Sequence, residues 1–384
     1  MKAWLIGIKG AVATTMLVGI LAIKRGLSSP RGIPTEDENL SRLNLTKLDD
    51  MSFGGHDIRD TPLYDAAHLN VRENRTFDTA QLSHLRAEIE SIPVACGILN
   101  NCGEAISALC NNERLTLREA TNQVSNDLTQ FAGHDDCVVV NLASTEPYFP
   151  PHAEYETLER FEAAIDANSK RIPASTIYAY CAIKNGMPYI NFTPSMGNDI
   201  PALRQLAEEL QVPHCGKDGK TGETLVKTAL VPMFKYRHLT IDGWYGSNIL
   251  GNLDGKILRH SDNKQSKLNT KTSVVPKMLG YEPHGGSRID YFPPLSDHKV
   301  AWDFISFRGF LDHRMNMQFT WQGCDSVLAA PLVIDLIRFM ELAKRRNIGG
   351  IIEELALYFK HPLGTDVLDL FSQYELLNQW LAHL

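Results

Sequence analysis

Lysines are concentrated in one short stretch of the chain, DNKQSKLNTKTSVVPK, which contains Lys264, Lys267, Lys271 and Lys277. In a helix, residues three and four apart share a face, so the first three would form a row of ammonium groups. Like charges at this spacing destabilise an isolated helix by about 0.2–0.5 kcal/mol per pair. The row is therefore either a solvated face or a place where an anion such as a phosphate ester binds. A lysine crowded by other cations also has a lowered pKa and exchanges protons near neutrality.

A second candidate site is the glycine turn near the start of the chain. Residues 7–13 read G-x-x-G-x-x-A and follow a short apolar segment. Glycines at a strand-to-helix turn let backbone N–H groups approach a pyrophosphate, so we predict a dinucleotide site. The predicted contacts come from Gly7, Ile8, Gly10, Ala11, Val12 and Ala13. The alternative is a plain turn that binds no ligand.

The acid that usually contacts the adenosine ribose is missing from its expected place. It normally lies about 20 residues after the glycines, but residues 27–35 contain no Asp or Glu. Asp57, in the segment GGHDI after the next predicted strand, is our substitute candidate. The alternative role for Asp57 is to stabilise a turn or cap a helix.

Two other glycine-rich segments could bind phosphate or shape a site. GKDGKTGETLVK resembles a P-loop, but His214 occupies the position where that motif requires glycine. Thr221 and Gly222 then form a helix N-terminus that either binds phosphate or is simply capped. In GWYGSNILGNLDGK, residues 243–256, four glycines and two asparagines predict a long turn segment that ends near Asp254. An ordinary turn cluster is the alternative.

Other charged residues follow predicted strands but show no catalytic motif by themselves. Asp218, Lys299, Asp325 and Lys360 each read, alone, as solvated surface charges. The sequence has no H-x-H or H-E-x-x-H pair for a metal and no G-x-S-x-G nucleophile turn.

Composition limits the class of protein. The 384 residues, 43% hydrophobic and 22% charged, suggest a globular protein of about two domains. A net charge of −7 disfavours a nucleic-acid partner. The seven cysteines are odd in number and include no C-x-x-C pair, which is typical of reduced thiols in a cytoplasmic protein. Gly7, Lys9 and Gly10 interrupt the first apolar run, so we expect neither a signal peptide nor a membrane span.

The predicted elements give an α/β fold with two domains. Strands alternate with helices over residues 1–225, which indicates a Rossmann-like, doubly wound parallel sheet. Residues 226–326 predict an α+β domain with a mostly antiparallel sheet and one helix, over 263–279. Its predicted strands are RHLTIDGWYGSNIL, SRIDYFPPL, HKVAWDFISFRGF and MNMQFTWQGCDS. A helix over 104–131, and C-terminal helices from VLAAPLVIDLIRFMELAKRR and GGIIEELALYF, are also expected. The helices within 327–384 would complete the first domain.

Taken in order, several segments resemble the myo-inositol-1-phosphate synthase family, also called inositol-3-phosphate synthases. They are NFTPS, GKDGKTGETLVKTAL, GSNILGNLDG, SKLNTKTSVV, DHKVAWD, DSVLAAPLVIDL and FKHPLG. Their order and approximate spacing match the family over most of the chain. The first turn is poorer in Gly and Asn than the eukaryotic GGNNG, and the chain is shorter. It therefore resembles the compact bacterial and archaeal branch.

The resemblance implies a reaction and its cofactor. The family converts D-glucose 6-phosphate to 1D-myo-inositol 3-phosphate with no net redox change. NAD accepts hydride from C5, an enolate then forms at C6 and closes on C1, and the hydride returns to the ring ketone. The sugar phosphate would be the small-molecule partner, in a cytoplasmic homotetramer. Some members use a divalent metal, and this sequence shows no dedicated cage for one.

The resemblance also implies roles for particular residues. Lys267 and Lys299 would serve the C5 oxygen and its proton, and Lys360 the oxygen that develops at C1. Lys271 would hold phosphate with Thr221, Gly222 and Asn248. Asp218, Asp254 and Asp325 would orient lysines or touch the nicotinamide, Leu250 would line the sugar site, and NAD would contact Ala143, Ser144 and Thr145.

Two other functions fit parts of the sequence. One is another NAD(P)-dependent oxidoreductase with net oxidation of its substrate, in which NADH would accumulate. The other is a catalytically silent NAD-binding regulator, which would not consume glucose 6-phosphate.

Overall fold

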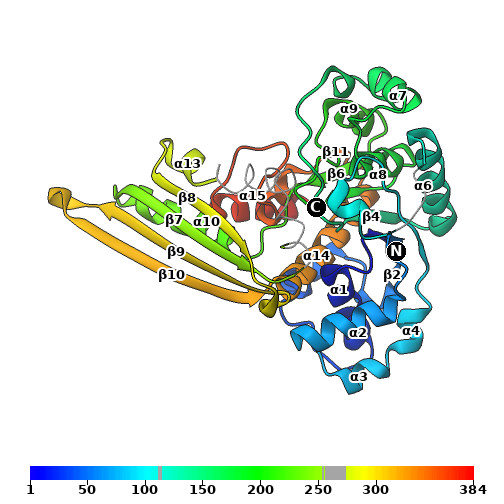
Figure 1. Cartoon of the computed structure of the whole chain (residues 1–384), viewed down its shortest axis with the longest axis horizontal. Helices are drawn as coiled ribbons and strands as arrows, with labels where there is room; N and C mark the ends of the chain where they lie inside the picture. Colours follow the sequence, from blue (N-terminus) through cyan, green and yellow to red (C-terminus); the bar gives the residue numbers. More distant parts are fainter. Residues whose placement is uncertain (111–114, 253–254, 256–273) are drawn as a thin grey trace.

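The computed structural model describes residues 1–110, 115–252, 255 and 274–384. Two sheets organise it. A seven-stranded sheet with helices on both faces forms the body, and a four-stranded sheet projects from the body as a long blade (Figure 1). In the described part of the chain, no helix is both long and apolar enough to cross a membrane.

All pairings within the seven-stranded sheet are parallel, and the strand order is β11-β6-β5-β4-β1-β2-β3. Chain order therefore reverses between β1 and β4, the topology of a doubly wound sheet. The strands are β1 (Lys2–Ile6), β2 (Ser52–Asp57), β3 (Val94–Cys96), β4 (Cys137–Asn141), β5 (Tyr189–Asn191), β6 (Pro213–Gly216) and β11 (Gly350–Ile351).

Alternate residues of the central strands enter two separate cores. In β1, Ala3 and Leu5 pack into one core, while Trp4 and Ile6 pack into the other. Because successive side chains of a strand point to opposite faces, a strand buried on both sides is apolar throughout, as KAWLI and CVVVN are.

The first core lies between the sheet and helices from both ends of the chain. Its main contributors are α1 (Ala11–Lys24), α2 (Leu63–Asn74), α14 (Asp325–Arg345) and α15 (Leu370–His383), with the short helices α3 (Thr79–Ser83) and α4 (Arg86–Glu90) beside them. Helix α14 packs directly against α1. The C-terminal segment therefore buries apolar surface on the same face of the sheet as the N-terminal glycine turn.

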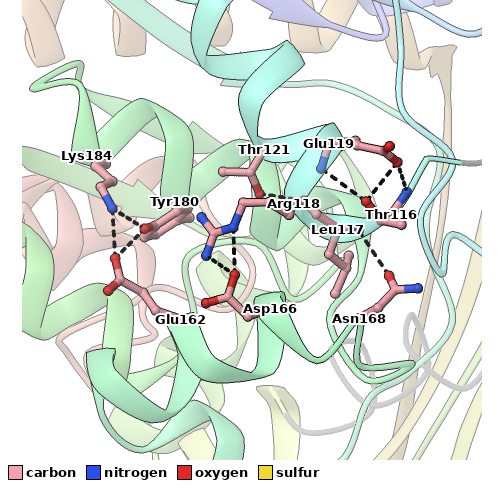
Figure 2. Close-up of polar contacts among 10 residues, drawn as sticks. All are labelled: Thr116, Leu117, Arg118, Glu119, Thr121, Glu162, Asp166, Asn168, Tyr180 and Lys184. Atoms are coloured by element: carbon pink, nitrogen blue, oxygen red, sulfur yellow. Dashed lines mark hydrogen bonds and ion pairs between the residues drawn. The ribbon is translucent and has the colours of Figure 1, made fainter.

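The second core is covered by α6 (Leu117–Ala132), α7 (Leu158–Asp166), α8 (Ala174–Lys184) and α9 (Pro201–Glu209); the short α5 (Glu104–Ser107) lies beyond β3. Figure 2 shows polar contacts on this side. Thr116 and Glu119 form a reciprocal capping box at the start of α6. Arg118 of α6 pairs with Asp166 of α7 at 2.6 Å, and Lys184 of α8 with Glu162 at 2.8 Å.

The four-stranded sheet has the order β10-β9-β7-β8. Strands β7 (Thr240–Leu250), β9 (His298–Arg308) and β10 (Arg314–Cys324) pair antiparallel, and β8 (His284–Tyr291) pairs parallel to β7. Helices α10 (Glu223–Tyr236) and α13 (Val274–Leu279) pack on one face, where Phe234 meets Trp244, Ile305 and Phe307.

Two expectations about local structure need correction, and one open choice is settled. Residues 243–250 fit both a strand, within RHLTIDGWYGSNIL, and a turn segment; they lie in strand β7, as the first of these predictions has it, because β8 and β9 supply its hydrogen bonds. The segment GGIIEELALYF is not a helix; it forms β11 and then a 3₁₀ turn over Glu353–Tyr358. The helix expected over 104–131 is two described helices, α5 and α6.

Candidate active site

A cavity of about 630 Å³ lies at the carboxyl ends of the parallel strands. It is lined by residues at or just after the ends of β1, β2, β4, β5 and β6, and by residues from the blade and from the start of α14. In open parallel sheets, ligands bind in the crevice at the carboxyl edge where strand order reverses. The cavity therefore occupies the place that this topology predicts for a ligand.

The glycine turn between β1 and α1 forms one wall. The N–H groups of Gly7 and Ile8 both donate to the carbonyl of His56, at 2.8 and 3.2 Å, so the turn is tied to the end of β2. Gly7 has a φ of +83°, and a Cβ there would lie 2.9 Å from Cα of Ala143. A residue without a side chain is therefore needed where the segments after β1 and β4 meet.

Gly10, Ala11 and Val12 line the cavity, whereas Ile8 and Ala13 are fully buried in the first core. Gly10 is the N-cap of α1 and has no side chain with which to cap the helix. The first N–H groups of α1 therefore face the cavity without a competing side chain from the N-cap, which suits an anion. Ile8 and Ala13 support the turn from below.

Asp57, the last residue of β2, lies where the ribose-binding acid of a dinucleotide fold is expected. Its carboxylate accepts hydrogen bonds from the backbone N–H of Lys9 at 2.8 Å and of Arg59 at 3.0 Å. It also forms an ion pair with the Arg59 guanidinium at 3.0 Å. The sequence pattern indicated Asp57 but not Arg59 or Lys9, which line the cavity beside it.

The segment after β4 forms the facing wall. Ala143, Ser144 and Thr145 all line the cavity. Next to them, the side chain of Glu146 is buried and accepts the backbone N–H of Ser175 at 2.9 Å and its hydroxyl. Burial raises the pKa of the Glu146 carboxyl to about 7. Glu146 was not predicted from sequence; a single acid in a loop after a strand carries no periodic signal.

Asp218 and Lys360, which both line the cavity, form a buried ion pair. Nζ of Lys360 donates to Oδ1 of Asp218 at 2.7 Å, and both side chains are less than one tenth exposed. The backbone N–H of Lys360 also donates to the carbonyl of Asp218 at 2.7 Å. Two residues 142 positions apart are therefore joined by both backbone and side chain.

Asp325 opens α14 and connects the cavity to the blade. Its Oδ1 accepts the hydroxyl of Thr221 at 3.3 Å, and its Oδ2 lies 3.9 Å from Nζ of Lys299. Thr221 and Asp325 line the cavity. Lys299 is buried in β9 and reaches this site through Asp325. A carboxylate at the first turn of a helix is stabilised by the helix dipole, so Asp325 is well placed to orient a lysine.

Asp297 is a junction that sequence reasoning missed. Its buried carboxylate accepts the backbone N–H of Ser326 at 2.9 Å and the amide of Asn252 at 2.8 Å. Its backbone N–H donates to Oδ1 of Asn74 at 2.9 Å. It therefore links the blade, α14 and α2 at the cavity wall. The available signal was its place as the first residue of the DHKVAWD segment, directly before strand β9.

The remaining predicted residues fall in two groups. Gly222 is the N-cap of α10, where a Cβ would lie 2.8 Å from Nε1 of Trp321. Asn248 and Leu250 are buried in β7, and Leu250 pairs with Lys299 across the sheet. These three do not line the cavity directly. Asp254, Lys267 and Lys271 lie outside the described residues, as do Lys264 and most of the helix expected over 263–279.

The residues present fit a dinucleotide. The tight approach of Gly7 to Ala143 forms a cradle that a Cβ would fill, the start of α1 offers N–H groups to a pyrophosphate, and Asp57 marks the ribose position. Among the residues that the structure describes, no cluster of three or more His, Cys, Asp or Glu side chains could hold a metal ion.

Comparison with known proteins identifies the family. The family model for myo-inositol-1-phosphate synthase matches residues 1–382. Inositol-3-phosphate synthase 1 of Bacteroides thetaiotaomicron is 35% identical, and the alignment covers 99% of this chain and 94% of that protein. Inositol-3-phosphate synthase 1 of Populus euphratica is 30% identical over 85% of this chain and 66% of that protein.

Solved structures show the same fold. Inositol-3-phosphate synthase from Caenorhabditis elegans superposes with a TM-score of 0.89 at 24% identity, covering 99% of this chain and 85% of that one. A myo-inositol-1-phosphate synthase-related protein from Thermotoga maritima gives 0.82 at 24% identity, over 99% and 98%. The predicted fold class, a Rossmann-like parallel sheet with a second, mostly antiparallel sheet, is confirmed. This chain belongs to the myo-inositol-1-phosphate synthase family, a family of NAD-binding proteins.

Proposed function

We propose that this chain isomerises D-glucose 6-phosphate to 1D-myo-inositol 3-phosphate in the cavity between the glycine turn and the blade. Family membership supports the reaction. The site assignment rests on the fact that residues from distant parts of the chain line the same cavity. The glycine turn, the Asp218–Lys360 pair and the Thr221–Asp325 pair come from distant parts of the chain and line one cavity.

NAD, when bound against the glycine turn, supplies a hydride acceptor that later returns the hydride. The chain's own residues then have to manage negative charge on oxygen at C5, in the enolate, and at C1. Lys360 lies on the cavity floor, where its ammonium would stabilise the oxygen that develops at C1. Asp218 holds this ammonium in place at 2.7 Å.

Lys299 would serve the C5 oxygen, with Asp325 keeping its ammonium directed toward the cavity. Thr221 offers a hydroxyl beside the first turn of α10, a position that suits a phosphate oxygen. Gly222 and Asn248 would support this phosphate site from behind. Lys267, Lys271 and Asp254 lie outside the described residues, and the roles implied for them by the family resemblance are part of this proposal.

We further propose that the chain has two domains with different functions. Residues 1–225 with 327–384 would bind NAD, and residues 226–326 would carry catalysis and assembly. The strands support this, because the seven-stranded sheet uses strands before residue 217 and after 349, while the four-stranded sheet uses only strands between 240 and 324. All seven cysteines are free thiols, which supports a cytoplasmic location.

The bare face of the blade supports assembly with further copies. Trp302 and Tyr245 are 37% and 39% exposed, and their rings lie 6.3 Å apart on the face opposite α10. Phe304 lies next to Trp302 at 6.2 Å. Contiguous exposed aromatics mark interaction surfaces. We propose that a second copy covers this face in a homotetramer.

The reaction is tested by following substrate and cofactor together. We expect purified protein with NAD at about one hundredth of the substrate concentration to consume nearly all glucose 6-phosphate, measured by ³¹P NMR. No lasting NADH absorbance should appear, because each hydride taken from C5 is returned. Lys360→Met, which removes the ammonium proposed to stabilise the C1 oxygen, provides the inactive control.

Two results would contradict this proposal. NADH formed in proportion to the substrate consumed would indicate an oxidoreductase with net oxidation. NAD binding without any consumption of glucose 6-phosphate would indicate a silent regulator.

A further inference from the structure

The end of β2 carries two features that dinucleotide-binding proteins usually use as alternatives. An acid there accepts a hydrogen bond from the ribose 2′-hydroxyl of NAD, whereas an arginine nearby accommodates the 2′-phosphate of NADP. This chain has both, Asp57 and Arg59, and both line the cavity beside the glycine turn.

The Asp57 carboxylate is fully engaged within the protein. Its Oδ1 accepts the backbone N–H and Nε of Arg59, both at 3.0 Å. Its Oδ2 accepts the backbone N–H of Lys9 at 2.8 Å and Nη2 of Arg59 at 3.2 Å. A carboxylate has about four acceptor positions, so a ribose hydroxyl has to displace one of the Arg59 side-chain bonds.

Two cations at this end of the cavity could contact an added phosphate. The Asp57 side chain is 3% exposed and is paired with the Arg59 guanidinium, and the Lys9 side chain lines the same cavity. Lys9 is held close because its Nζ donates to the backbone carbonyl of Arg59. The Arg59 side chain is 29% exposed, so it can turn from Asp57 toward a ligand without being extracted from the core. Glu73, which also lines the cavity, and Asp60, the next residue in the chain, are acids that oppose an anion here, so the phosphate depends on a direct bond to the Arg59 guanidinium.

We infer that Arg59 is a specificity-determining residue that lets the cofactor site accept a 2′-phosphorylated adenosine as well as a 2′-hydroxyl. This rests on the proposed function, in which the adenosine ribose of the dinucleotide lies at the end of β2. When the 2′-position carries a hydroxyl, the guanidinium gives up one of its two bonds to Asp57 and keeps the other. It bonds the phosphate bidentately when the 2′-position carries a phosphate, because guanidinium matches phosphate geometry.

The test compares two adenosine fragments that differ at the 2′-position. Calorimetry measures the affinity of 5′-AMP and of 2′,5′-ADP for the wild type, Arg59→Ala, Arg59→Gln and Arg59→Lys. Arg160→Ala is the matched control, because Arg160 is a surface arginine of α7 paired with Glu156. Charge-assisted hydrogen bonds to a phosphate correspond to a factor of about 10–100 in affinity.

We expect the wild type to bind 2′,5′-ADP at least as tightly as 5′-AMP. In Arg59→Ala and Arg59→Gln the ratio of the two affinities should fall about tenfold or more, because the phosphate then faces Asp57 without its guanidinium. Arg59→Lys should keep part of the ratio and Arg160→Ala all of it. A ratio that changes less than about threefold in both neutral variants would overturn the inference.

The proposed function fails separately. Binding of NAD and turnover of glucose 6-phosphate by the wild type can both be intact when the fragment ratio is insensitive to Arg59, and then only the inference on Arg59 is lost. Absence of NAD binding to the wild type would instead remove the cofactor site on which the inference rests.

Discussion

Asp218 and Lys360 form a buried ion pair whose structural role and proposed catalytic role can be tested separately. Taking two charges out of water costs free energy that their attraction only partly recovers, so a buried pair is weak evidence for stability alone. Here the pair lines the cavity rather than the core. Removing one partner takes an opposite charge at 2.7 Å away from the other, which stays buried. Mutation can therefore separate an effect on stability from an effect on activity.

We expect Lys360→Met to lower activity by about 10²-fold or more, because the cation beside the developing C1 oxygen is lost. We also expect the free energy of unfolding to fall by about 3–5 kcal/mol, since the buried Asp218 carboxylate loses the ammonium it is bonded to. The double variant Asp218→Asn/Lys360→Met should recover at least half of that stability while remaining inactive. Chemical denaturation and steady-state kinetics measure the two effects.

The matched single variant Asp218→Asn separates orientation from charge. It keeps the ammonium but removes the carboxylate that positions it, so activity should fall less than in Lys360→Met. If activity returned in the double variant along with stability, the pair would be structural and the role proposed for Lys360 would be wrong.

At this scale, the sequence could supply residue types but not partners. Asp218, Lys299, Asp325 and Lys360 stood out only as charges at strand ends until the family resemblance grouped them. The pairs Asp218–Lys360 and Lys299–Asp325 depend on the fold, which brings distant segments together. Glu146 gave no signal, because burial, which raises the pKa of its carboxyl to about 7, is not visible in a loop sequence.

At the scale of elements, the cavity depends on how closely two loops meet. The turn after β1 and the segment after β4 touch at Gly7 and Ala143, next to the point where strand order reverses. Gly7 combines two constraints, a left-handed φ of +83° and a lack of room for a Cβ. Gly26, after α1, has only the first, with a φ of +68° and open space for 4 Å around the place where a Cβ would lie.

This contrast gives a matched pair of substitutions. Gly26→Ala should lower the free energy of unfolding by about 1–2 kcal/mol, which is the cost of a left-handed φ for an ordinary residue. Gly7→Ala should cost more and also weaken NAD binding at least about tenfold, because the methyl group would push the loops apart at the proposed dinucleotide site. Thermal unfolding and calorimetric titration with NAD check this. Equal NAD affinity in the two variants would place the cofactor elsewhere.

The sequence predicted the elements that follow simple patterns. Continuous apolar runs gave the buried strands, and the strand–turn–helix opening gave β1 and α1 in the right places. Prediction from sequence was incomplete where the structure of a segment depends on the strands beside it. For β7 the sequence left two interpretations, a strand in RHLTIDGWYGSNIL and a turn around Gly243 and Gly246, and the two flanking strands that complete its hydrogen bonds decide for the strand. Segment 349–359 read as a helix, yet the open edge of β6 recruits Gly350 and Ile351 as a strand.

At the scale of the whole molecule, the blade has one covered face and one bare face. The covered face carries Lys299, Asn248 and Leu250, and the bare face carries Tyr245, Trp302 and Phe304. Because alternate residues of one strand point to opposite faces, β9 presents Lys299 to one side and Trp302 to the other. A partner copy on the bare face would therefore fix the strand that positions a proposed catalytic lysine.

Trp302→Glu tests this link between assembly and activity. A buried aromatic contributes about 150–250 Å² of contact, and a carboxylate in its place would be desolvated without a partner, so the tetramer should dissociate. Sedimentation velocity should show smaller species with unchanged far-UV circular dichroism. At low protein concentration the specific activity of this variant should be below that of the wild type. It should rise as the concentration is increased, because reassembly restores the position of β9. Leu210→Glu, at an exposed site after α9, is the control and should leave both assembly and activity as in the wild type. A Trp302→Glu variant that sediments like the wild type would show that this face does not hold the assembly together.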